Sequence, residues 1–409
     1  MEATTAAGAT HGDLPWTPVA RLAFRAAFVY FALFFIGSLL DTGPGPRALL
    51  AALSTTPVRW FGHGVMRLGG SPNDGGAPWA IAQQIVAVLF ALAIAAVWSL
   101  ASRRLEYRRL HGWFRLALRY YVAGVMLVYG GFKVIESQFP PLTLDQLAQP
   151  LGTMSPMGLL WAFMGYSTTY ATFTGLGESI GAFLLFFRRT TTAGALILVA
   201  VLSNVALLNY AFDVPVKQLS SNLLLAAVVL AVPDVRRLLA VFVLNRASQP
   251  VDLAFELPRW LERARRFVKP AVIVGATCIP LTFSFFIHRR FFERPALHGI
   301  YDVDRFERNG TVVPPVLTEA TRWRRVVFDR PGSVSIRLMN DSTRSLGAAV
   351  DTVRQRITLS SRADARIRSV MAYEPLAAGG LRVRGVQGTD TIDVTLRRLD
   401  HRKLFRLLR

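Results

Sequence analysis

The chain has 409 residues, of which 52% are hydrophobic and only 18% are charged. Soluble proteins usually carry about 25% charged residues, so this composition excludes a disordered chain and disfavours a purely soluble one. The net charge is +21. The basic residues stand mainly in short runs between apolar blocks, which indicates membrane topology and not nucleic-acid binding.

Redox and metal chemistry find little support in the composition. Cys278 is the single cysteine, so a disulfide within the chain and a Cys-x-x-Cys pair are excluded. The six histidines are scattered without metal-ligand spacing, and no metal site is expected.

Seven apolar blocks are long enough to cross a bilayer, which needs about 20 residues. They cover residues 19–40, 78–100, 113–135, 157–187, 193–212, 217–232 and 271–287. The fourth block is too long for one straight helix. Ser155-Pro156 predicts its start, because serine caps helices and proline suits the first turn, and Gly165 predicts a break near 165–168.

Two further segments are amphipathic and too short or too mixed to span. Residues 47–68, interrupted by Pro57, and residues 234–245 are predicted to lie in the membrane interface. Ordinary helices packed on protein are the alternative.

Arginine clusters orient the predicted spans. Basic runs follow the second, fourth and sixth blocks, beginning with Arg103, Arg104, Arg108 and Arg109, whereas the opposite loops are nearly free of basic residues. The positive-inside rule places the N-terminus in the cytoplasm of a bacterial inner membrane. Residues 1–18 have no basic residue before the first apolar run, so the first span is expected to stay as an anchor. Seven crossings then place residues 295–409 in the periplasm or outside the cell.

From residue 295 the pattern changes to alternating apolar and polar residues. Turn residues such as Asn309-Gly310 and Gln387-Gly388 separate these runs, which predicts an antiparallel all-β domain, a small barrel or a sandwich. The predicted domains are 1–112 with two spans and an interfacial helix, 113–240 with four spans, 241–294 with a linker and the seventh span, and 295–409.

Three predicted spans contain polar residues at comparable depth. Arg119, Glu178 and Asn204 lie roughly 9, 14 and 16 Å from the cytoplasmic ends of their spans at 1.5 Å per residue. Charges in hydrocarbon are costly, so we expect a buried Arg119–Glu178 pair with Asn204 nearby, and Arg25 as a competing partner. The pair is either a proton, quinone or ligand site or a structural link between helices.

A second polar group lies toward the predicted outer face. It suggests an outward-facing pocket, whose candidate lining residues are Lys133, Gln138, Trp161, Tyr170 and Asp213. Packing, with tryptophan and tyrosine anchored at the membrane interface, explains the same residues equally well.

Residues 113–240 resemble the DoxX-like family of four-helix membrane proteins. The resemblance rests on Arg119 with Gly131-Phe132-Lys133, on Gly177-Glu178-Ser179-Ile180-Gly181, on Asn222, and on the exit Pro233-Asp234-Val235-Arg236-Arg237. It implies a four-helix core and a link to quinone-coupled sulfur oxidation or to membrane redox and stress complexes. The opening Gly299-Ile300-Tyr301 is similar to the Gly-x-Trp of lipocalins, which implies a lipocalin-like barrel.

The expected fold is therefore a mainly α membrane protein of about seven transmembrane helices with a C-terminal all-β extracytoplasmic domain. The first functional hypothesis is a redox- or stress-associated membrane subunit that binds a quinone or a lipid, with the bilayer and a membrane redox protein as partners. A quinone is the one candidate cofactor, and if the chain is an enzyme it is a subunit of a quinone-linked oxidoreductase. The alternative is a non-catalytic envelope scaffold that binds a lipid or a partner through the β domain.

Overall fold

The computed structural model describes residues 16–41, 47–74, 76–249, 258–361 and 368–400. The chain divides into two compact units, Met1–Val134 with Thr172–Leu281 and Ile135–Ala171 with Thr282–Arg409. We call them the helical unit and the barrel unit. The predicted cytoplasmic segment 1–15 lies outside the described residues, and the domain boundaries predicted within the helical part stay predictions.

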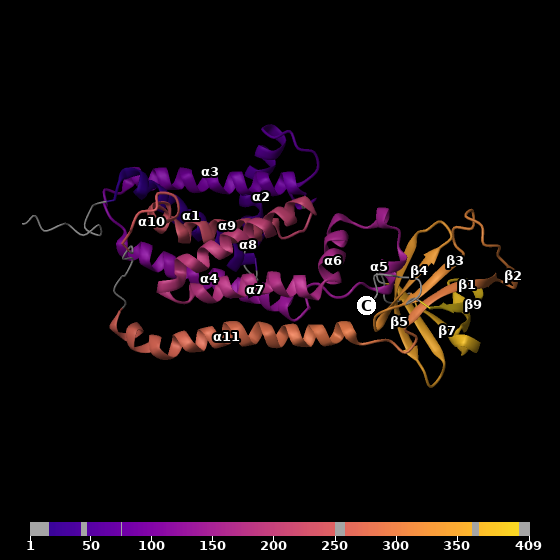
Figure 1. Ribbon diagram of the computed structural model, residues 1–409. Coiled ribbons are helices and arrows are strands. Elements are labelled where there is room, and N and C mark those ends of the chain that lie inside the picture. Colours follow the sequence, from indigo (N-terminus) through magenta and orange to yellow (C-terminus); the bar gives the residue numbers. More distant parts are fainter. Residues whose placement is uncertain (1–15, 42–46, 75, 250–257, 362–367, 401–409) are drawn as a thin grey trace, which may run out of the picture. The chain divides into compact units, whose positions relative to one another are not determined.

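Long helices make up the helical unit (Figure 1). They are α1 (Pro18–Asp41), α2 (Arg47–Gly64), α3 (Ala77–Ala101), α4 (Arg108–Val134), α7 (Thr168–Leu185), α8 (Thr191–Ala211), α9 (Lys217–Ala231), α10 (Val235–Phe242) and α11 (Arg259–Phe292). Helices α7 and α11 each run from one unit into the other. Short 3-10 turns lie at Pro72–Asp74, Arg188–Thr190 and Val232–Asp234.

Within the described residues, four helical stretches are long and apolar enough to cross a membrane: Pro18–Gly37, Ala77–Ala101, Arg188–Ala211 and Glu262–Phe292. They correspond to the first, second, fifth and seventh predicted blocks. The other three blocks are helical as α4, as α6 (Pro156–Tyr166) followed by α7, and as α9. The count of seven spans therefore stays a prediction.

The predicted break in the fourth block is confirmed. Helix α6 starts at a Ser155 cap, whose Oγ accepts the Gly158 N–H at 3.0 Å, and it ends at Ser167 before α7 begins. The predicted interruption at Pro57 is wrong, because helix α2 continues through that proline. Ten residues of α2 precede Pro57, so the proline lies in the interior of the helix, where it removes one backbone hydrogen bond.

Helix α4 supplies much of the core of the helical unit. Leu118, Val122, Ala123 and Met126 are fully or almost fully buried there, together with leucines of α8 and α9 such as Leu198. The outward surfaces of the long apolar helices are themselves apolar, as on α3, where Leu89 and Val97 are 51% and 66% exposed. The helical unit is thus apolar both in its centre and over much of its surface.

The barrel unit begins with the short helices α5 (Leu144–Ala148) and α6. Its strands are β1 (Gly299–Arg308), β2 (Thr311–Val312), β3 (Trp323–Phe328), β4 (Gly332–Leu338), β5 (Thr343–Asp351), β6 (Arg356–Ser361), β7 (Arg368–Pro375), β8 (Leu381–Gln387) and β9 (Asp390–Leu399). Short 3-10 turns lie at Leu151–Thr153 and Ala377–Gly379.

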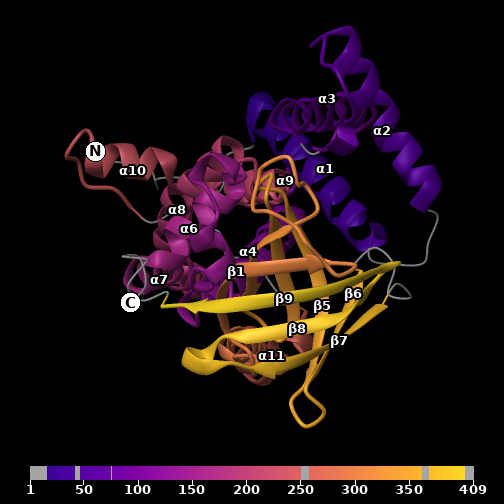
Figure 2. The same ribbon diagram turned by 90° about the vertical axis from the view of Figure 1, so that its right-hand side faces the viewer.

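The strands form a closed antiparallel barrel. Eight of them follow one another in the order β1-β3-β4-β5-β6-β7-β8-β9, and β9 pairs with β1 to close the ring, while β2 extends β1 as a hairpin. Figure 2 shows β9, β8 and β7 in succession. The predicted antiparallel β domain is confirmed, and it is a barrel and not a sandwich. The β1–β2 turn has positive φ at Asn309 and Gly310, as a two-residue hairpin requires.

Alternate residues of the strands point inward and fill the barrel. The buried cluster is rich in bulky side chains such as Phe306, Trp323, Ile336 and Ile357. A smaller apolar cluster joins Leu144 of α5 to Ile300 and Val327 on strands β1 and β3.

Hydrogen bonds fasten both ends of α5 to the barrel. Asp329 accepts the Leu144 N–H at 3.1 Å, and Arg337 donates to the Ala148 carbonyl at 2.6 Å. Helix α5 is therefore an integral part of the barrel unit.

Candidate functional site

Helices α4 and α7 approach each other closely at two glycines. A Cβ atom at Gly130 would lie 2.8 Å from the Gly175 carbonyl oxygen, and one at Gly175 would lie 2.7 Å from Cβ of Lys133. Only glycine permits backbones to come this near. Lys133 and Glu178 each lie three residues after one of these glycines, which brings them to the same interface.

Lys133 and Glu178 form a buried ion pair. The Lys133 ammonium donates to Oε1 of Glu178, and the two side chains are 6% and 1% exposed. The second carboxylate oxygen, Oε2, is buried and has no hydrogen-bond partner among the described residues. A buried acceptor without a donor is costly, so this oxygen is a natural place for a hydroxyl group or a proton.

The predicted Arg119–Glu178 pair is wrong. Arg119 instead donates from Nε to the Leu185 carbonyl at 2.8 Å. Leu185 is the last residue of α7 and lies seven residues beyond Glu178, or roughly 10 Å along the helix. The carbonyls of a final helical turn lack partners within the helix and attract cations, so Arg119 caps α7.

Two other arginines also find partners apart from Glu178. Arg115 donates to the Leu230 carbonyl near the end of α9 at 3.0 Å, in a second cap from α4. Arg25, the competing partner expected from the sequence, donates to the Tyr107 hydroxyl at 2.8 Å. The three buried arginines Arg25, Arg115 and Arg119 therefore bind neutral oxygens, and Lys133 binds the Glu178 carboxylate.

Asn204 does not join the ion pair. It is exposed on α8, and no described hydrogen bond or contact links it to Arg119 or Glu178. The three-residue polar site expected from the sequence thus reduces to Glu178, with Lys133 as its partner.

The residues of the predicted outer pocket have separate partners. Asp213 is 61% exposed and binds Lys217 at 2.6 Å, while Lys133 binds Glu178. Trp161 packs edge-on against Phe139, and Tyr170 packs against Phe163.

Gln138 is half-buried, and its Oε1 has no partner in the described part of the chain. Neither of the two described cavities is lined by any of these five residues, so the outer pocket stays a prediction.

A polar network that sequence reasoning missed connects three helices. The Tyr30 hydroxyl of α1 donates to Oδ1 of Asn222 on α9, and Gln84 of α3 donates from Nε2 to the Tyr30 oxygen. Gln218 adds a bond to the Ala80 carbonyl. The signal for this network in the sequence is the pair Gln83-Gln84 within the second apolar block.

Comparison with known proteins adds one relative. The chain is 34% identical over 135 residues to the uncharacterized protein YwoB of Bacillus subtilis, a match that covers 33% of this chain and 82% of YwoB. No family model and no solved structure matches the chain.

Proposed function

We propose that this chain, which belongs to the same family as the uncharacterized protein YwoB of Bacillus subtilis, is an integral membrane subunit that binds a quinone or quinol beside Glu178. In this proposal the protein crosses the bacterial inner membrane seven times and residues 113–240 form a DoxX-like core. The N-terminus is cytoplasmic, and the lipocalin-like barrel lies in the periplasm or outside the cell.

The polarity of the helical unit supports a membrane setting. Its four long apolar helices expose most of their length, and soluble proteins rarely expose apolar patches larger than a few hundred Å². Water around such surfaces would drive aggregation, whereas lipid chains accommodate them.

The unpartnered Oε2 of Glu178 is the observation that carries the quinone proposal. A quinol hydroxyl can donate to this oxygen, and the Lys133 ammonium can donate to a quinone carbonyl. A carboxylate and an ammonium held together therefore offer complementary contacts to both redox forms of the ring. The pair also provides a group that can take up a proton when a quinol is oxidised.

Oxidation of a quinol to a quinone releases two electrons and two protons. Glu178 can accept one proton, and the second proton and the two electrons require acceptors outside this pair. Cys278, the single cysteine of the sequence, is exposed on α11 and cannot form a dithiol with another cysteine of the chain. The proposal therefore includes a membrane redox partner protein and leaves the overall reaction unassigned.

The test is to purify the full chain in mild detergent and to extract and quantify bound quinone by mass spectrometry. We expect stoichiometric quinone in the wild type, and a loss of at least tenfold in Glu178→Gln and in Lys133→Met. The matched control is Glu262→Gln, which makes the same change at an exposed position of α11. Equal quinone content in wild type, Glu178→Gln and Lys133→Met overturns the proposal.

A scaffold that acts through the barrel is the second proposal. It is favoured by the self-contained barrel core and by a sequence with 21 basic and 12 acidic residues from position 295 onward. Bulky side chains occupy the described barrel interior, so a partner or lipid would bind the basic outer surface. Capture of one stoichiometric protein by the full chain, without any quinone, would favour this function.

A further inference from the structure

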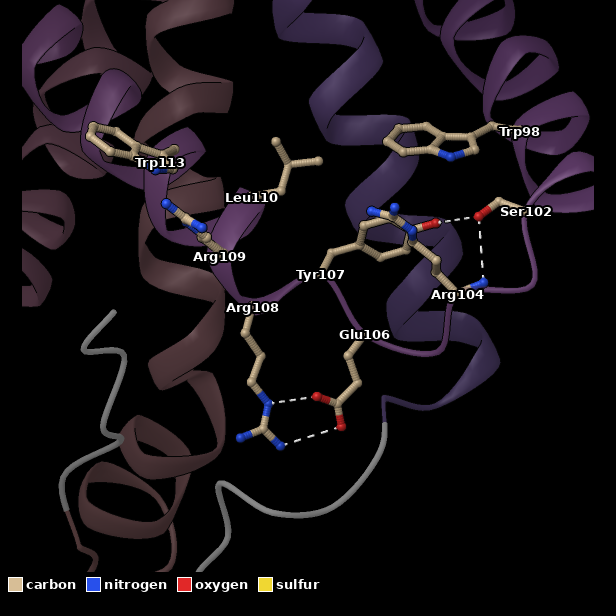
Figure 3. Close-up of a pocket in the computed structure, with 9 residues that line it drawn as sticks. All are labelled: Trp98, Ser102, Arg104, Glu106, Tyr107, Arg108, Arg109, Leu110 and Trp113. Carbon is tan, nitrogen blue, oxygen red and sulfur yellow. Dashed lines mark hydrogen bonds and ion pairs between the residues drawn. The ribbon is translucent and has the colours of Figure 1, made fainter. Parts of the chain in front are cut away.

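The connection between α3 and α4 is a strongly basic part of the helical unit that the quinone proposal leaves unused. Residues 102–109 contain four arginines and one glutamate. They border a cavity of about 610 Å³, which Trp98 and Trp113 flank from the two helices (Figure 3). The positive-inside rule accounts for the presence of these arginines. It does not account for a cavity lined by them.

A buried arginine lies beneath this connection. Arg25 of α1 is 4% exposed, and it donates to the Tyr107 hydroxyl at 2.8 Å and to the Ser102 carbonyl at 3.3 Å. Its guanidinium also lies over the rings of Tyr107 and Trp98, at 5.1 and 5.7 Å from their centres. Aromatic faces and neutral oxygens hold this cation, and no carboxylate among the described residues neutralises it.

The cavity itself carries excess positive charge. Glu106 is its single acidic lining residue, and this carboxylate is paired with Arg108 at 2.9 Å. Arg104 and Arg109 also line the cavity, and no described ion pair engages either of them. Burial works to raise the pKa of Tyr107, but its hydrogen bonds with Ser102 and Arg25 and the charges of Arg25 and Arg104 lower it on balance. Two arginines without a described ion pair thus line the cavity, and the buried Arg25 lies against two further lining residues, Tyr107 and Trp98.

We propose that this cavity binds the phosphate of an anionic phospholipid headgroup. Arginine matches phosphate geometry with paired N–H donors, so Arg104 and Arg109 can bind the phosphate, while the buried Arg25 adds positive charge next to the lining residue Tyr107. The surroundings favour a lipid over a free phosphate, because the lining residues Trp98 and Ser102 belong to the same helix end as the exposed apolar residues Val97 and Leu100. Trp98 and Trp113 are typical of the level where headgroups meet acyl chains.

The test uses the full chain, reconstituted in nanodiscs of phosphatidylcholine alone or mixed with phosphatidylglycerol. Native mass spectrometry after detergent release counts the phosphatidylglycerol that each protein molecule retains. We expect retention to fall about fivefold for Arg104→Gln and for Arg109→Gln, and about 25-fold for the double variant. Arg103→Gln is the matched control, because Arg103 is exposed on the same connection but does not line the cavity.

Two outcomes overturn the proposal. Equal phosphatidylglycerol retention in the double variant and in Arg103→Gln means that the cavity does not select the lipid. Displacement of the lipid by millimolar inorganic phosphate, with the same dependence on Arg104 and Arg109, identifies a site for free phosphate instead. Neither outcome depends on Glu178, so this test and the test of the quinone proposal can fail separately.

Discussion

The two units of this protein differ in where they place their ion pairs. The barrel unit keeps a core of aromatic and aliphatic side chains, buries one arginine, Arg322, and carries ion pairs such as Arg397–Asp304 and Arg382–Asp393 outside that core. The helical unit buries an ion pair and three arginines and exposes leucines and valines. Surface ion pairs over an apolar core are the arrangement expected of a protein in water. Buried charges under an apolar surface are the arrangement expected in lipid. The contrast between two parts of one chain supports a membrane setting better than composition alone.

The largest expected effect breaks the buried pair. Glu178→Ala leaves the Lys133 ammonium buried without its carboxylate, which should destabilise the helical unit by about 3–5 kcal/mol. Thermal unfolding in detergent, followed by circular dichroism, measures this loss. The double variant Lys133→Met with Glu178→Leu should recover most of it.

In the barrel, Asp304→Asn removes an exposed partner of Arg397 and should change stability by about 1 kcal/mol or less. A similar loss of stability in Glu178→Ala and in Asp304→Asn would contradict the contrast between the two units.

A smaller effect should follow from closing the gap between α4 and α7. Gly130→Ala places a Cβ 2.8 Å from the Gly175 carbonyl, and this overpacking should cost about 1–3 kcal/mol. Gly124→Ala on the same helix meets nothing within 4 Å and should stabilise by about 0.5–1 kcal/mol. Opposite shifts in unfolding temperature for these two variants would locate the helix contact, and shifts of the same sign would argue against it.

The polar network should contribute less than the ion pair. Tyr30→Phe removes the hydroxyl shared by Gln84 and Asn222 and should destabilise the helical unit by about 1–2 kcal/mol. Tyr121→Phe is the control, since Tyr121 makes ring contacts with Phe35 and Phe34 and no described hydrogen bond. The prediction fails if both variants unfold at the same temperature as the wild type.

The smallest effects are pH dependences within the barrel unit. Burial raises the pKa of Asp145 on α5, against opposing contributions from Ser335 and Arg337. A hydrogen bond from Arg382, with Arg384 adding to it, lowers the pKa of Asp393 on β9. Asp145 thus contributes stability below about pH 4 that is lost as pH rises through its folded pKa. Asp393 contributes stability above about pH 4 that is lost as pH falls.

Hydrogen exchange of the full chain between pH 3 and 7 measures both effects, which we expect to be about 1 kcal/mol or less. At neutral pH, Asp145→Asn should slow the hydrogen exchange of α5, whereas Asp393→Asn should speed the hydrogen exchange of β9. The same direction of change in both variants would show that the assigned causes are wrong.

The sequence predicted the local structure well, because periodicity and caps act over a few residues. The break after α6, the Ser155 cap and the Asn309-Gly310 hairpin all depend on neighbours along the chain. The Glu178 partner could not be found this way. The depth of a residue in its predicted span is counted from the span's end, as if every span were straight and its position known. Arg119 and Lys133 are then both plausible partners of Glu178, because the contact between α4 and α7 is not known from the sequence.

Hydrophobic periodicity and turn residues specify each element locally, so they are enough to predict that this chain combines apolar helices with an antiparallel β domain. Closure of the strands into a barrel could not be predicted in this way, because it depends on the pairing of β1 with β9, which lie far apart in the sequence. The pairing of Lys133, and not Arg119, with Glu178 likewise depends on the packing of the helices. That choice follows from two glycines, Gly130 and Gly175, which bring α4 and α7 together at one height.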